Sequence, residues 1–190
     1  MTSEPPALEQ AKKRRVLPAL VGAVAVVVLA VVVVSVSAGT SSGRGVTDPA
    51  RFDLPGLGGS PRVQLAAYRG KPVVVDLFAS WCAACRTELP GMARVAKELQ
   101  GTVTFIAVDS DDSGRGAGMA RDYGLAAAGF VLATDVGGSQ GSGLHDALGA
   151  PGMPATAFYD ASGHVVFKAI EAIPEDTLRR ELNRLYGLHV

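Results

Sequence analysis

The pattern of hydrophobic and polar residues beyond residue 50 predicts a strand that leads directly into a helix. Residues 73–78 are apolar except for Asp76, which is typical of a strand buried on both faces of a parallel or mixed sheet. Within residues 83–100, apolar positions recur at helical spacing, at Leu89, Met92, Val95, Ala96 and Leu99. We therefore expect a central strand and a long helix joined by a short turn.

Shorter patterns on both sides supply the remaining expected elements. We expect strands at residues 52–55, 62–65, 102–108, 130–133, 155–159 and 164–170, and helices at residues 117–123, 144–148 and 174–186. The run Asp160-Ala161-Ser162-Gly163 is a strong hairpin signal between the last two strands. The glycine-rich stretches 114–118 and 137–143 lack the spacing of phosphate-binding loops and are expected to be plain loops. Alternating strands and helices predict an α/β fold.

The N-terminal region predicts a membrane anchor. Residues 16–36 are almost entirely Val, Ala and Leu, and about 20 such residues span a bilayer. The basic run 12–15 precedes this span, which predicts a cytoplasmic segment 1–15 and an exported remainder. The alternative is a secretory signal cleaved after Ala38, although signal peptides usually have an apolar core of only about 7–15 residues. Both interpretations place the rest of the chain outside the cytoplasm.

Residues 37–50 are rich in Ser, Gly and Thr and predict a flexible linker with a reach of roughly 20 Å. The remaining residues, 51–190, have the usual length of one domain. The chain has a formal net charge of +0 and a pI of about 6.8, and its Lys and Arg residues beyond the N-terminus are scattered. This distribution argues against a nucleic-acid partner.

The only two cysteines, Cys82 and Cys85, stand between the expected strand and helix. The first turn of a helix offers unpaired N–H groups and a partial positive charge, which lower the pKa of a thiol placed there. A redox-active dithiol is therefore favoured. Zinc would need a second close pair of ligands, whereas His145, His164 and His189 are scattered. An inert structural disulfide would gain little from so short a loop.

Several further motifs accompany the dithiol. They are Gly70-Lys71-Pro72 before the strand, Glu88-Leu89-Pro90 in the helix, Pro151-Gly152-Met153-Pro154-Ala155-Thr156 and the hairpin at 160–163. With these motifs, the chain from residue 52 onward resembles the thioredoxin fold, and in particular the membrane-tethered TlpA/ResA-like thiol-disulfide oxidoreductases. The resemblance implies a central mixed sheet flanked by helices. Residues 109–148 resemble the central insertion, an extra strand and helix, that separates this group from plain thioredoxins.

The resemblance also implies roles around the dithiol. Cys82 matches the exposed nucleophile and Cys85 the buried resolving thiol, the two forming the redox disulfide. Asp76 matches the buried acid of thioredoxins. Burial should raise its pKa, so that it accepts the proton of Cys85; the alternative is a hydrogen-bonded core acid without that role. Trp81 matches the aromatic residue that covers the site, with core packing as the alternative.

Glu88 matches a helix acid that tunes the thiols, while an ordinary first-turn acid that favours the helix dipole is the alternative. Met153-Pro154 matches the loop opposite the dithiol in which the proline is cis and the Met153 backbone pairs with a client peptide. Thr156 is expected to be structural. The chain departs from its relatives at Ala83-Ala84, where they place a proline before the second cysteine, and this leaves the direction of electron flow open.

The implied function is an extracytoplasmic reductant of disulfides in exported proteins, with apocytochrome c as one client class and a membrane electron donor. No cofactor or metal is expected. An exported disulfide oxidase is the close alternative. A thiol peroxidase is disfavoured because Trp81 and Arg86 do not supply the activating Thr and Arg, and a non-enzymatic peptide- or metal-binding module is the remaining alternative.

Overall fold

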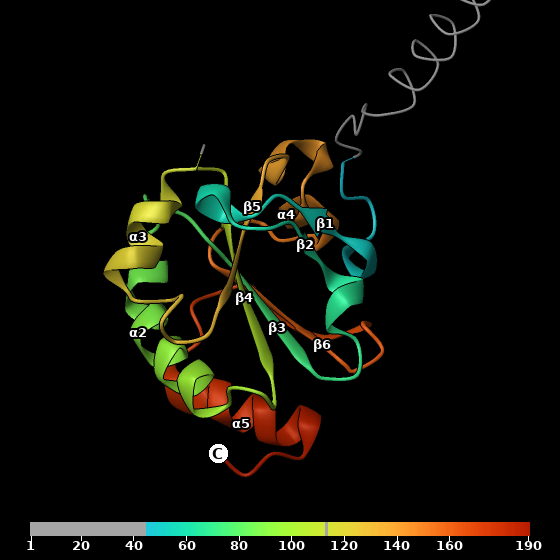
Figure 1. Ribbon diagram of the computed structural model, residues 1–190, viewed down its shortest axis with the longest axis vertical. Helices are drawn as coiled ribbons and strands as arrows, with labels where there is room; N and C mark the ends of the chain where they lie inside the picture. Colours follow the sequence, from blue (N-terminus) through green and yellow to red (C-terminus); the bar gives the residue numbers. More distant parts are fainter. Residues whose placement is uncertain (1–44, 113) are drawn as a thin grey trace, which may run out of the picture. The chain divides into compact units, whose positions relative to one another are not determined.

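A five-stranded mixed sheet forms the centre of the domain (Figure 1). The computed structural model describes residues 45–112 and 114–190. The strand order is β5-β4-β3-β6-β7, with β3 (Val73–Phe78), β4 (Thr104–Ser110), β5 (Val131–Asp135), β6 (Ala155–Tyr159) and β7 (Val165–Ala169). Strands β3, β4 and β5 are parallel, and β6 and β7 run antiparallel to their neighbours. The mixed sheet expected from the sequence is confirmed.

Strand β3 is buried at every position, as its apolar run predicts. Alternate side chains enter two cores. Val74 and Phe78 face a cluster built with α2 (Ala83–Glu98), α3 (Gly116–Asp122) and α5 (Glu175–Tyr186). Val73, Val75 and Leu77 face a second cluster with β1 (Asp53–Leu54), β2 (Val63–Gln64) and α4 (Leu144–Ala147). Asp76 shares the first face, so the sheet directs it toward α2.

The expected elements are present, with ends that differ by a few residues. The short turns are η1 (Pro49–Arg51), η2 (Leu57–Gly59), η3 (Leu65–Tyr68) and η4 (Gly138–Ser142). The η4 turn lies in the glycine-rich stretch expected to be a plain loop. Tertiary hydrogen bonds shape it: the Asp111 carboxylate accepts from the Ser139 N–H at 2.9 Å, and the Val46 N–H donates to the Ser142 carbonyl at 2.7 Å.

The domain begins before residue 51, because Val46 makes this bond and the Pro49 carbonyl accepts from the Tyr159 hydroxyl at 3.1 Å. The last part of the expected linker is therefore held by the fold. Within residues 45–112 and 114–190, no helix has the length and apolar character needed to cross a membrane. The expected anchor at 16–36, the basic segment 1–15 and residues 37–44 of the expected linker lie outside the described residues.

Candidate active site

The two cysteines lie where β3 passes into α2, and they form a disulfide with an S–S length of 2.01 Å. Cys82 is the N-cap residue of α2, and its sulfur accepts a hydrogen bond from the Cys85 N–H at 3.0 Å. The N-terminus of a helix presents backbone N–H groups and a partial positive charge, which favour a sulfur anion over a neutral thiol. The local geometry therefore places Cys82 where the N-terminus of α2 would favour the thiolate that disulfide exchange requires.

Cys82 is less accessible than expected, and Cys85 is buried as expected. Cys85 is fully buried, whereas Cys82 keeps 3% of its surface exposed. The expectation of an exposed Cys82 is wrong for this disulfide form, because Cys82 packs in the apolar cluster between α2 and the sheet. Cys82 is nevertheless the only one of the two with any exposed surface, so an incoming sulfur can reach only Cys82.

Asp76 is completely buried in β3, on the face that carries α2. Its Oδ1 accepts a hydrogen bond from the Thr156 hydroxyl at 3.1 Å, and its Oδ2 has no partner within residues 45–112 and 114–190. Burial raises the pKa of Asp76, and the bond from Thr156 lowers it by a smaller amount. Thr156, expected to be structural, is therefore part of the acid's environment. The antiparallel register pairs the two residues directly across β3 and β6.

Glu88 is a second buried acid behind the dithiol. It is 3% exposed, and its Oε2 accepts from the Ile173 N–H at 2.8 Å. Its Oε1 has no partner in the part of the chain that the structure describes. Burial raises the pKa of Glu88, and the nearby carboxyl of Asp76 raises it further. The alternative of an ordinary first-turn acid is wrong, because Glu88 lies beyond the first turn and faces the core. The charge of each acid therefore influences the protonation of the other.

Trp81 is 54% exposed, and its indole N–H donates to the Asp111 carbonyl at 3.0 Å. Core packing, the alternative role for Trp81, is therefore excluded. The Met153–Pro154 peptide bond is cis, as the resemblance implies. Met153 is half-buried and packs against the apolar cluster that contains both cysteines. An exposed aromatic ring and the cis-proline loop thus accompany the dithiol.

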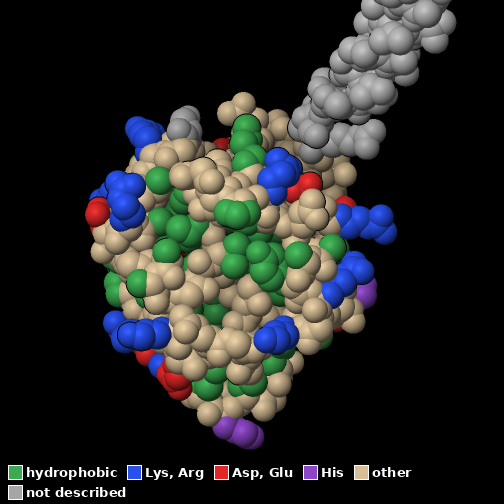
Figure 2. All heavy atoms as spheres, in the orientation of Figure 1, with side chains coloured by type: hydrophobic (Ala, Val, Ile, Leu, Met, Phe, Trp, Pro, Cys, Tyr) green, Lys and Arg blue, Asp and Glu red, His purple; other side chains and the backbone are tan. Residues whose placement is uncertain are grey.

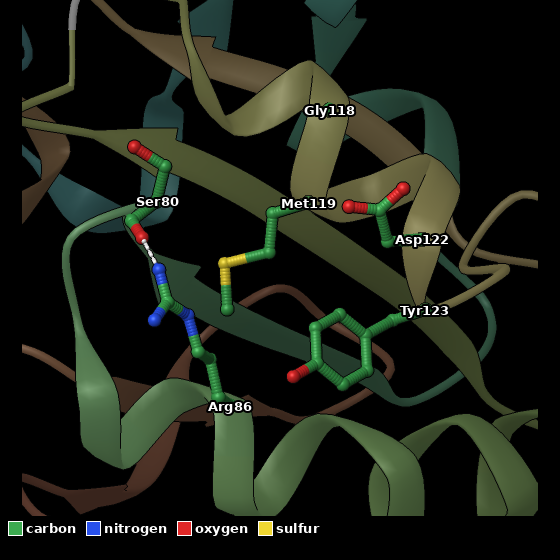
Figure 3. Close-up of a pocket in the computed structure, with 6 residues that line it drawn as sticks. All are labelled: Ser80, Arg86, Gly118, Met119, Asp122 and Tyr123. Atoms are coloured by element: carbon green, nitrogen blue, oxygen red, sulfur yellow. Dashed lines mark hydrogen bonds between the residues drawn. The ribbon is translucent and has the colours of Figure 1, made fainter.

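The turn before Cys82 has partners that the sequence did not single out. The N–H and the hydroxyl of Ser80 donate hydrogen bonds to the carboxylate of Asp112. The guanidinium of Arg86 donates to the Ser80 carbonyl (Figure 3). Arg86 and Ser80 also line a hollow of about 350 Å³, with Met119 and Asp122 of α3 and the following residue, Tyr123, on its other side (Figure 3). The only sequence feature that could have indicated these contacts is the acidic run 109–112 at the end of β4. Strand β3 ends at the same edge of the sheet.

No three His, Cys, Asp or Glu side chains gather as ligands of one metal ion within the residues that the structure describes. On the face shown in Figure 2, Lys and Arg side chains lie at separate points, both at the edge and within the face, and apolar side chains are visible across the middle. The groups that the site brings together are the two sulfurs and the buried acids Asp76 and Glu88.

Comparison with known proteins agrees with this geometry. The AhpC/TSA family model matches residues 46–168. The thiol:disulfide interchange protein DsbE of Pseudomonas fluorescens is 33% identical over 136 residues, which is 71% of each chain. DsbE of Pseudomonas aeruginosa is 29% identical over the same length and shares.

Solved structures show the same fold. DsbF of Mycobacterium tuberculosis has a TM-score of 0.60 and 25% identity, covering 72% of this chain and 96% of its own. A secreted disulfide oxidoreductase of M. tuberculosis has a TM-score of 0.59 and 24% identity, covering 74% and 98%. The family match, the DsbE relatives and the dithiol at the start of α2 lead to one conclusion. The chain belongs to the AhpC/TSA family and is a TlpA/ResA-like thiol-disulfide oxidoreductase of the thioredoxin superfamily.

Proposed function

We propose that this protein is a membrane-anchored, outward-facing reductant of disulfides in exported proteins. The observation that carries the proposal is the Cys82–Cys85 pair at the start of α2 with two buried acids behind it, each with an unpartnered oxygen. The DsbE relatives support disulfide exchange, and one structural neighbour is described as secreted. The expected anchor at 16–36 supports the location.

In the proposed reaction, the Cys82 thiolate attacks one sulfur of a client disulfide. The client S–S bond breaks, a Cys82–client mixed disulfide forms, and the released client thiolate takes a proton. Cys85 then gives its proton to the Asp76 carboxylate and attacks the Cys82 sulfur. The second client thiolate leaves, so two electrons have passed to the client and the Cys82–Cys85 disulfide has formed. A dithiol electron donor at the membrane restores the reduced form.

The raised pKa of Asp76 suits this step, because a carboxylate with a pKa near that of its proton donor exchanges protons efficiently. The charge of Glu88 would influence how readily Asp76 accepts this proton. Trp81 and the Met153 backbone beside cis-Pro154 would hold the client polypeptide, the backbone by strand-like pairing. Apocytochrome c, whose thiols must be reduced before haem attachment, is the client class that we propose first.

The decisive measurement is the reduction potential of the Cys82/Cys85 couple. A value near about −270 mV, as in thioredoxin, is expected for a reductant. A value near about −120 mV, as in DsbA, would overturn the proposal in favour of an exported oxidase. Trapping on a Cys85→Ser variant of the full chain would identify the clients, because it stalls the mixed disulfide at Cys82. A Cys82→Ser, Cys85→Ser variant serves as the control that captures nothing covalently.

A further inference from the structure

Asp112 is a buried carboxylate beside the dithiol whose hydrogen bonds converge on a single residue. Its side chain is fully buried. Its Oδ2 accepts from the Ser80 N–H at 2.5 Å, and its Oδ1 accepts from the Ser80 hydroxyl at 2.8 Å. Arg115, from the same loop, donates to Oδ1 at 3.1 Å. Two of the three donors thus belong to a residue that lies 32 positions away in the sequence.

Ser80 occupies a critical place in the active-site turn. It follows the end of β3 and precedes Trp81 and Cys82, so its position sets where the Cys82 sulfur meets the first N–H groups of α2. The remaining polar group of Ser80, its carbonyl, accepts from the Arg86 guanidinium (Figure 3). Every polar group of Ser80 is therefore held, by the β4–α3 loop on one side and by α2 on the other.

We infer that Asp112 is a positioning residue for the dithiol: its carboxylate fixes Ser80, and through Ser80 it keeps the Cys82 sulfur at the N-terminus of α2. Without this bond the turn relaxes, and the sulfur loses its alignment with the Cys85 N–H and the helix dipole. The thiolate of Cys82 is then less stable, and attack on a disulfide is slower. This inference rests on the proposed role of Cys82 as the attacking thiol.

The test compares Asp112→Ala with Asp112→Asn in the reduced protein. We measure the pH profile of Cys82 alkylation by iodoacetamide and the rate of reduction of a model peptide disulfide. D112A should move the alkylation profile to higher pH and slow reduction by roughly tenfold to a hundredfold, the effect of a small misplacement at a reacting centre. D112N should keep both properties within about threefold of the parent, because its amide oxygen can accept from the Ser80 N–H and its amide nitrogen can donate to the Ser80 hydroxyl, so that both contacts with Ser80 remain.

Glu171→Gln, at an exposed acid between β7 and α5, is the matched control and should match the parent protein. A folded D112A with the parent's profile and rate would overturn the inference. So would a D112N that behaves like D112A, since charge rather than position would then be responsible. If D112A does not fold, Ser80→Ala decides: it removes one of the two bonds to Asp112, and an unchanged alkylation profile would overturn the inference. Full turnover by Cys82→Ser would instead overturn the proposed role of Cys82.

Discussion

Two regions next to the dithiol each contain a buried aspartate, and the two aspartates have opposite surroundings. Behind the dithiol, Asp76 accepts one hydrogen bond and keeps an unpartnered oxygen. Beside it, Asp112 accepts three, on both oxygens. Both side chains are fully buried. Burial alone therefore does not distinguish the roles of the two acids. The number of hydrogen-bond donors around each carboxylate does distinguish them.

The physical reason lies in how donors act on a carboxylate. Few donors leave the charged form poorly solvated, which raises the pKa and prepares the group to exchange a proton. Several donors solvate the charge and fix the carboxylate, which then holds whatever donates to it. By this comparison, the region behind the dithiol suits proton transfer and the region beside it suits positioning. The following predictions test that division.

The largest effect is expected for Asp76→Asn. Loss of the proton acceptor should slow the resolving attack by Cys85 about a hundredfold near neutral pH, with recovery at alkaline pH where Cys85 ionises without help. Stopped-flow fluorescence can follow a single turnover, because the chain's only tryptophan is Trp81, next to Cys82. Glu171→Gln, at an exposed acid, is the control. Equal rates for D76N and the parent protein at neutral pH would remove Asp76 from the proton path.

The second prediction concerns the stability of the oxidised protein. The pKa of Glu88 is raised in the folded state, so as the pH rises above about 4 the unfolded chain loses this proton first. The stability that protonated Glu88 provides is therefore present at acid pH and lost as the pH rises through the folded-state pKa. Glu88→Gln should leave acid stability nearly unchanged and increase alkaline stability by about 1–3 kcal/mol.

Urea unfolding at pH 5 and pH 9 measures both values. Exposed Glu171 provides the control, Glu171→Gln, which should change neither. A uniform change in the stability of E88Q at the two pH values would show that the variant acts through packing and not through the proton.

The sequence predicted the scaffold of the site better than its contacts. The apolar run at residues 73–78 predicted a strand buried on both faces. The same pattern identified Asp76 as a candidate site residue, because an acid is unusual inside an apolar run. The position of Cys82 at a helix start followed from the helical spacing that begins just after it. These features depend on neighbours in the sequence, which is why local patterns reveal them.

The missed features depend on registers between distant segments. Thr156 meets Asp76 only because β6 pairs antiparallel with β3. Asp112 meets Ser80 only because β3 and β4 are parallel and end at the same edge. The near-complete burial of Cys82 arises from packing in the cluster between α2 and the sheet. Without these strand pairings, a single sequence shows that the acids are present, but it does not show which residues donate hydrogen bonds to them.

A smaller effect is expected for Thr156→Val. The Thr156 hydroxyl is the one hydrogen-bond donor to Asp76, and its bond lowers the pKa of that acid. Removing it should raise the pKa further, so that the rise of the resolving rate with pH moves up by about one pH unit. Thr156→Ser keeps the hydroxyl and should keep the profile. A shift shared by both variants would point to altered packing of β6 and not to the lost donor.

The smallest effect is expected for Arg115→Gln, which removes only the exposed partner of Asp112. The Arg115 side chain is 71% exposed, and such ion pairs contribute at most about 1 kcal/mol. The two Ser80 donors remain, so the alkylation profile of Cys82 should be unchanged and the reduction rate should stay within about twofold of the parent. A loss as large as that expected for D112A would mean that Asp112 is held by its ion pair, and the contrast between the two aspartates would then be one of charge compensation and not of donor number.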